Sequence, residues 1–116
     1  MTEPVVRRTV LRETLTDFAT GSVEVRRITL QPGVVGGPHH HNGPVFGVIE
    51  RGSVMFQVDG GEEQLLRPGD VFYEPEQALV DRFDATDEGV TFLGYFLSRP
   101  GQDPELIAGP PTRSQH

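Results

Sequence analysis

The sequence predicts an all-β protein, an antiparallel β-sandwich or jelly-roll barrel, and three observations carry this prediction. Glycine and proline are frequent, with 14 and 10 copies, and the apolar residues between them form only short runs. Turn signals recur roughly every 8 to 12 residues, a spacing typical of antiparallel sheets and too short for strands that alternate with helices. A length of 116 residues suffices for one domain with one core.

The first well-patterned strand is predicted over residues 23–30, after a turn at Gly21-Ser22. Its apolar alternation changes parity at Arg26-Arg27, so we expect a β-bulge there and solvated arginine side chains. The preceding residues 4–18 carry short apolar runs, which indicate one or two edge strands.

The following strands are separated by clear turn residues, of which Pro68-Gly69-Asp70 and the hairpin signal Asp59-Gly60-Gly61 are examples. They are predicted over residues 39–41, 45–49, 53–58, 71–74, 79–84 and 90–97. The barrel should thus occupy residues 1–98, with its core over 21–97. Residues 99–116 hold four prolines and are expected to form a loose tail that docks through Leu106-Ile107.

Composition narrows the function classes. The formal net charge of −7 repels phosphate backbones and anionic membrane surfaces, so neither nucleic acid nor a membrane is expected as a partner. Cysteine and lysine are absent, which excludes thiolate nucleophiles, disulfides and Schiff bases. The chain shows no apolar signal core and no run of roughly 20 apolar residues, and we expect a cytoplasmic protein.

Three consecutive histidines, His39, His40 and His41, are the outstanding chemical feature. Alternation along a strand places His39 and His41 on one face and His40 on the other. Two imidazoles on one wall can bind a metal, or they can act as general acid and base near neutral pH. The alternative is a polar strand end with solvated histidines.

The spacing around these histidines resembles the first motif of the cupin superfamily. Gly33 is followed by the five residues VVGGP, then by His39 and His41, and finally by Gly52. Gly69, the residues DVFYE and Pro75 match the start of the second cupin motif. This resemblance to small single-domain cupins of the type-2, conserved-barrel family implies a jelly-roll barrel whose site lies inside, around the histidines.

Two metal-ligand positions of the cupin motifs are changed. The resemblance places a glutamate of motif one and a histidine of motif two at positions that read Val45 and Val80 here. The other histidine of the chain is His116, in the tail. We therefore expect either no metal or a weakly held divalent transition metal on His39 and His41.

A carboxylate or amide from another strand could replace the lost ligands. The candidates are Glu74, Asp81, Asp84 and Gln57. Strand parity directs Asp81 outward, and Glu74 is interpreted as structural because related cupins often carry a glutamate there.

The two valines also predict an apolar wall facing the imidazoles, and hence a small-molecule pocket. If Val80 faces inward, alternation brings Arg82 inward as well, where it could bind a carboxylate or an enolate oxygen. A surface ion pair at the barrel mouth is an equally good interpretation of Arg82. The expected substrate-binding residues are Val45, Gln57, Val80 and Arg82.

Three functions fit these features. The first is an isomerase, cyclase or lyase that acts on a small, largely apolar carbonyl or carboxylate compound with His39 or His41 transferring a proton. The second is a metal-dependent oxygenase or isomerase that uses Fe, Mn, Ni or Zn, and the third is a non-catalytic binding module. Cupins similar to this chain occur in bacterial secondary metabolism and aromatic catabolism.

A homodimer is expected because small cupins commonly pair through an edge strand or a sheet face, which covers unpaired strand edges. Val5, Val6 and Val10 are candidates for this contact, although an ordinary edge strand would explain them equally well.

Overall fold

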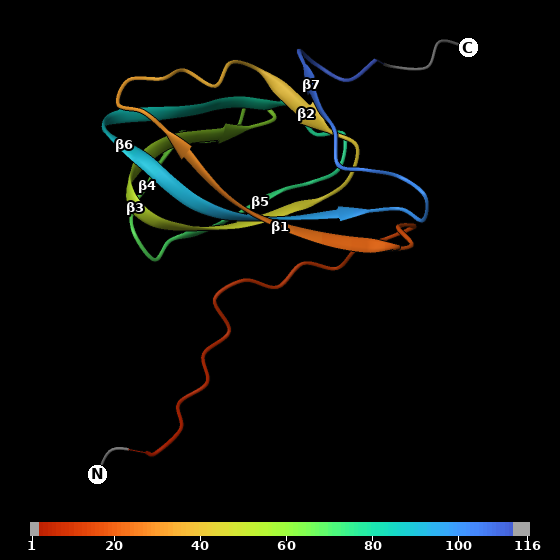
Figure 1. Cartoon of the computed structure of the whole chain (residues 1–116), viewed down its shortest axis with the longest axis horizontal. Coiled ribbons are helices and arrows are strands. Elements are labelled where there is room, and N and C mark those ends of the chain that lie inside the picture. Colours follow the sequence, from red (N-terminus) through yellow and green to blue (C-terminus); the bar gives the residue numbers. More distant parts are fainter. Residues whose placement is uncertain (1–2, 113–116) are drawn as a thin grey trace.

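The all-β prediction is confirmed by the structure, a computed structural model that describes residues 3–112. These residues form an antiparallel jelly-roll barrel and contain no helix (Figure 1). The strands are β1 (Ser22–Leu30), β2 (His39–His41), β3 (Val45–Val58), β4 (Gln64–Leu66), β5 (Val71–Glu74), β6 (Val80–Ser98) and β7 (Leu106–Ala108). Across the described range, then, no helix is available to span a membrane.

The strands form one sheet in the order β4-β3-β6-β2-β7, with β1 added to β6 and β5 added to β3. The two long strands β3 and β6 bend around the barrel and pair with each other along most of their lengths (Figure 1). Every pairing is antiparallel. This arrangement puts the histidine strand β2 between β6 and β7, opposite the end of β5 across the barrel interior.

The core consists of aromatic and aliphatic side chains from the inner faces of these strands. Four phenylalanine rings form its centre, with neighbouring ring centroids 4.8 to 6.0 Å apart. They are Phe56, Phe72, Phe83 and Phe92. Three of these rings, Phe72, Phe83 and Phe92, also line the cavity that contains His39 and His41.

Two strand boundaries expected near residue 51 and near residue 87 do not exist, because β3 and β6 are continuous. The register of β3 against β6 shifts between Ile49 and Arg51 and again between Gly52 and Val54. Gly52 has a φ of 72°, and a Cβ there would lie 2.0 Å from the Gly89 carbonyl oxygen. The Arg51-Gly52 signal therefore marks a bulge within one strand rather than a turn between two. Strand β4 has no counterpart among the predicted elements.

The β-bulge expected in the first strand is wrong. Every residue of β1 pairs in regular register with β6, from Ser22 with Ser98 to Leu30 with Val90. Regular alternation places Arg26 on the inner face with Ile28 and Leu30, and it leaves the valines of β1 on the outer face. The apolar pattern of the sequence changes parity because Val23 and Val25 are apolar but lie on the exposed outer face.

The edge strands expected within residues 4–18 are also absent. The first strand begins at Ser22. Residues 11–18 lie along the outside of the barrel, where Phe18 contacts Arg99, and the residues before them are extended and run away from it, in red in Figure 1. A strand requires a partner edge for its backbone hydrogen bonds, and residues 3–10 lie on none within the described chain.

The segment predicted as a loose tail contributes a strand instead. β7 pairs with β2, joining Ala108 to His39 and Leu106 to His41. Its docking point therefore includes the expected Leu106-Ile107 pair. His116 lies outside the described residues.

Candidate metal centre

The three histidines of β2 are all buried, which contradicts the interpretation as a solvated strand end. His39 and His41 share one face, with their ring centroids 5.1 Å apart and their planes at 88°. His40 points the other way, and its Nδ1 lies 2.8 Å from the carbonyl oxygen of Gly109. The alternation predicted from the sequence thus separates a pair of site histidines from one that contacts the C-terminal segment.

The buried carboxylate of Glu74 at the end of β5 meets these two imidazoles. Its Oε1 lies 3.0 Å from Nε2 of His41 and 4.0 Å from Nε2 of His39. One ligand atom from each of the three residues falls within 4.8 Å of the others. Two imidazoles and one carboxylate at this separation form a donor set suited to a divalent transition metal.

The hydrogen bonding of these groups fits a shared cation. Oε1 of Glu74 is buried and has no hydrogen-bond donor among the described residues, although Nε2 of His41 lies 3.0 Å away. Nδ1 of His39 lies 2.9 Å from the Gly37 carbonyl oxygen, so its proton is held there and Nε2 keeps its lone pair toward Glu74. A buried carboxylate without hydrogen bonds costs several kcal/mol unless a positive charge lies close to it.

The position of Glu74 explains how a carboxylate reaches the site although Val45 stands at the motif position. Val45 of β3 and Glu74 of β5 are direct cross-strand partners. Side chains at such positions point to the same face, with Cβ atoms about 4.5 to 5.5 Å apart. Glu74 therefore supplies its carboxylate from the neighbouring strand.

A cavity of about 160 Å³ adjoins the three polar side chains. Its walls are mostly apolar, and Val45 belongs to them as predicted. The lining residues are Arg26, Ile28, Leu30, His39, His41, Val45, Phe72, Glu74, Phe83, Phe92, Phe96, Pro104, Glu105 and Leu106. An apolar cavity with a few polar groups at one end is the usual form of a small-molecule site.

Two other residues predicted to bind a substrate lie away from this cavity. Val80 pairs with His39 across the strands but packs into the core, fully buried. Gln57 donates a hydrogen bond of 2.8 Å to the carbonyl oxygen of Gly61 at the hairpin. Neither residue contributes to the cavity lining.

The inward orientation expected for Arg82 is also not observed. Gln57 and Val58 are neighbours in β3 but pair with Arg82 and Val80, so Asp81 of β6 has no partner in β3. This extra residue reverses the alternation, and Arg82 faces outward although Val80 faces inward. Arg82 consequently lies at the surface and forms ion pairs with Glu63 and Asp84. These hydrogen bonds raise the pKa of Arg82 above its ordinary value. The surface ion pair, the alternative interpretation of Arg82, is confirmed, and Asp84 is not a ligand.

Arg26 and Glu105 also line the cavity, although neither was expected from the sequence. Arg26 is the basic one of the two. Its side chain lies over the ring of Phe96, with Cζ 5.0 Å from the ring centroid, and it forms an ion pair with Glu24. Regular alternation backward from Ile28 would have identified Arg26 as inward-facing. The same rule applied to Phe72 in β5 would have placed Glu74 in the interior.

Comparisons with known proteins agree with this architecture. Residues 26–87 match the cupin domain family. No curated protein matches the chain. A cupin-like protein from Thermotoga maritima has a TM-score of 0.63 and 23% identity, with 74% of this chain and 65% of that chain covered.

Two structurally similar enzymes are larger. The DMSP lyase DddQ from Ruegeria pomeroyi has a TM-score of 0.65 and 19% identity, covering 72% of this chain and 42% of its own. Recombinant oxalate oxidase in complex with glycolate has a TM-score of 0.61 and 19% identity, and the match covers 74% of this chain and 45% of the oxidase chain. This chain thus corresponds to less than half of either enzyme, and the similarity concerns the fold alone.

The matched family covers more than half of the 116 residues, and the barrel places a histidine pair and a carboxylate inside, where the motif spacing predicted a site. This chain belongs to the cupin domain family.

Proposed function

We propose that this protein is a metal-dependent cupin enzyme that acts on a small, largely apolar carbonyl or carboxylate compound. His39, His41 and Glu74 would hold one divalent transition-metal ion. The observation that carries the proposal is the buried Oε1 of Glu74, which has no hydrogen-bond donor in the described chain and faces two imidazole nitrogens. A cation at this point would compensate the buried charge.

The donor set favours particular metals. Two histidines and one carboxylate with open positions are typical of non-haem Fe²⁺ enzymes, and the same ligands accept Mn²⁺, Ni²⁺ and Zn²⁺. When bound, such an ion supplies Lewis-acid or redox chemistry to an oxygen ligand. Two neutral imidazoles and one carboxylate leave a single positive charge on a divalent ion, which favours an anionic or strongly polarised oxygen group beside it.

The protein side chains have distinct tasks in this arrangement. The Gly37 carbonyl orients His39, and the packing of Phe96 against the ring of His41, with centroids 5.7 Å apart, orients the second imidazole. The phenylalanines of the cavity exclude water and receive the apolar part of a substrate. Rigid ligands and a dry cavity are what a metal enzyme requires of its protein.

A second candidate rests on the 3.0 Å contact between His41 and Glu74. In the absence of metal, Glu74 could orient and charge-stabilise the His41 imidazole, which would then transfer a proton as general acid or base. This is the proton-transfer function that the histidine pair suggests. It differs from the metal enzyme in one measurable respect, because metal-free protein would keep full activity.

The first experiment is the metal content of the protein, purified without a His-tag or chelator, measured by mass spectrometry together with the melting temperature on addition of Mn²⁺, Fe²⁺, Ni²⁺ or Zn²⁺. We expect about one equivalent of metal per chain. We also expect added metal to raise the melting temperature, since a ligand at 100 times its Kd stabilises a folded protein by about 2.7 kcal/mol. His41→Gln and Glu74→Gln should abolish the rise.

His40→Gln is the matched control, because His40 lies between the two ligands but faces away from them. It should keep the metal-dependent rise. Equal metal content and equal thermal shifts in the wild type and in Glu74→Gln would overturn the assignment of Glu74. Wild-type protein that binds no added metal would favour the metal-free candidate.

A further inference from the structure

We propose that Arg26 is the carboxylate-recognition residue of the cavity, so that the ligand is a monocarboxylate whose carboxylate binds Arg26 and whose apolar body fills the cavity. This inference deepens the proposed function and rests on it for the reaction. The binding preference itself can be measured with or without metal.

The location of Arg26 is the first argument. Among the residues that the structure describes, it is the one arginine that lines the cavity, and alternation in β1 directs it inward with Ile28 and Leu30. Its side chain is 44% exposed, so it lies at the mouth, within reach of an entering molecule. The contact with Phe96, with Cζ 5.0 Å from the ring centroid, favours a defined position of the guanidinium over that ring.

The hydrogen bonds of Arg26 are the second argument. Its Nε donates to Glu24, whereas Nη1 and Nη2 have no acceptor among residues 3–112. By contrast, Arg99 uses both terminal nitrogens on Glu76, and Arg82 uses Nη1 on Glu63. A guanidinium with its terminal nitrogens unused offers two parallel donors, the geometry that matches a carboxylate.

The distances allow one small molecule to contact both Arg26 and the metal centre. Arg26 Cζ lies 5.0 Å from the centroid of Phe96, and that centroid lies 5.7 Å from the His41 ring. Cζ of Arg26 therefore lies at most 10.7 Å from the centroid of the His41 ring, because the two distances add up to this value. Cavities of roughly 150 Å³ hold a benzene ring, so the space of about 160 Å³ suits a body of six to eight carbon atoms.

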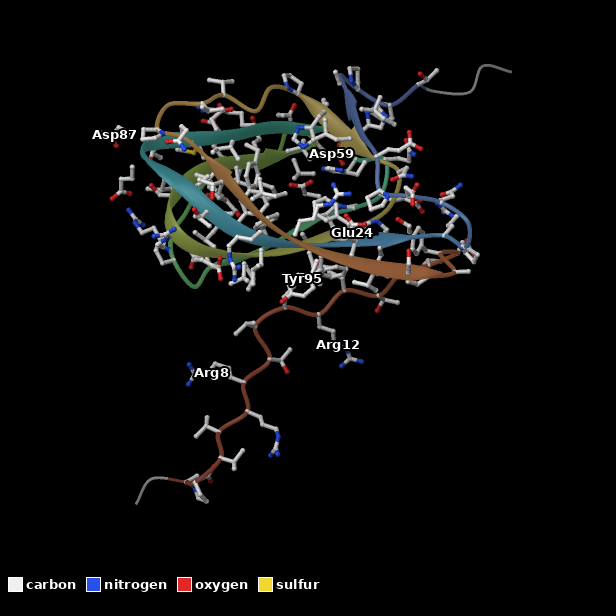
Figure 2. All side chains as sticks on the ribbon, in the orientation of Figure 1. Arg8, Arg12, Glu24, Asp59, Asp87 and Tyr95 are labelled. Carbon is white, nitrogen blue, oxygen red and sulfur yellow. The ribbon has the colours of Figure 1, made fainter. Side chains whose placement is uncertain are left out.

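The surrounding charges select a singly charged ligand. Glu24 pairs with Arg26, and Glu105 also lines the cavity. These two carboxylates would repel a dianion such as a phosphate monoester more strongly than a monocarboxylate. Figure 2 shows Glu24 on β1, on the wall of the barrel.

The test compares straight-chain acids from butanoate to octanoate, and phenylacetate, with their primary amides. Their Kd values are measured by calorimetry on metal-free protein and on protein loaded with redox-silent Zn²⁺. We expect the best acid to bind about tenfold more tightly than its amide, as a charge-assisted hydrogen bond of about 1.5 kcal/mol predicts. Arg26→Gln should reduce this preference to about twofold or less.

Arg27→Gln is the control, because it makes the same change of net charge on the same strand. Arg27 faces outward and pairs with Glu50 at 2.8 Å, so the acid preference should persist in this variant. A preference that survives Arg26→Gln, or a wild type that binds no acid more tightly than its amide, overturns the proposal. Metal content and melting temperature are recorded for every variant, so loss of the metal centre and loss of carboxylate recognition are distinguished.

Discussion

At the scale of single residues, the site depends on the cross-strand pair of Val45 and Glu74. These residues face each other across β3 and β5, so either can direct a side chain at the same part of the interior. In this chain the pair supplies one carboxylate, from Glu74, and one apolar wall residue, Val45. A carboxylate at either of the two positions could therefore serve as the third metal ligand.

This equivalence predicts that the carboxylate can be moved from β5 to β3. Glu74→Val should lose metal binding, because the two histidines alone are poor ligands for a divalent ion. The double variant Val45→Glu with Glu74→Val should recover a large part of the metal-dependent rise in melting temperature, which a thermal melt with added Mn²⁺ or Zn²⁺ measures. A double variant as inert as Glu74→Val would show that the carboxylate must come from β5.

At the scale of elements, the cavity depends on the short strand β7 and the residues before it. Pro104, Glu105 and Leu106 form part of the cavity wall, although the three residues of β7 are exposed. Asn42 holds this segment through two hydrogen bonds of 2.9 Å, one to the Asp103 carbonyl oxygen and one from the Glu105 amide. The wall is therefore attached by few contacts, which is typical of segments that open locally.

Asn42→Ala should loosen this wall. Loss of the two exposed hydrogen bonds costs about 1 kcal/mol, which corresponds to roughly fivefold faster amide hydrogen exchange over residues 103–109. Hydrogen exchange followed by mass spectrometry measures this, and the amides at the centres of β3 and β6 in the same sample serve as the internal control. Unchanged exchange over 103–109 would mean that pairing with β2 alone holds the segment.

At the scale of the whole molecule, the extended N-terminal segment differs in charge from the barrel. Residues 3–12 contain three arginines and one glutamate, whereas the rest of the chain contains seven arginines and sixteen carboxylates. Val5, Val6 and Val10 are 56%, 67% and 66% exposed. Figure 2 shows Arg8 and Arg12 on this segment as it leaves the barrel.

The expected homodimer remains a prediction, and these features suggest how to test it. A basic, apolar segment is complementary to the acidic barrel of a second copy, whose outer face exposes Val23, Val25 and Tyr95. Light scattering after size exclusion should give the mass of a dimer. Val6→Asp with Val10→Asp should shift the protein to a monomer.

Val35→Asp is the control for this experiment, because Val35 is 69% exposed on a different part of the barrel. It adds one negative charge without altering the N-terminal segment, and the dimer should persist. A wild-type protein of monomer mass, or a dimer unaffected by the double substitution, would contradict the prediction.

The sequence by itself determined the features that depend on local periodicity and turn chemistry. Alternation placed His39 and His41 on one face, and the glycine and proline spacing identified the barrel and the strand that carries Glu74. Tertiary structure decided which other side chains join them. Alternation turns Glu74 and Arg26 inward, but cross-strand register decides that they meet the histidine cavity, and an irregular register on β6 turns Arg82 away. Pairing between strands distant in the sequence depends on the energy of the whole sheet, so residue types along one strand do not reveal it.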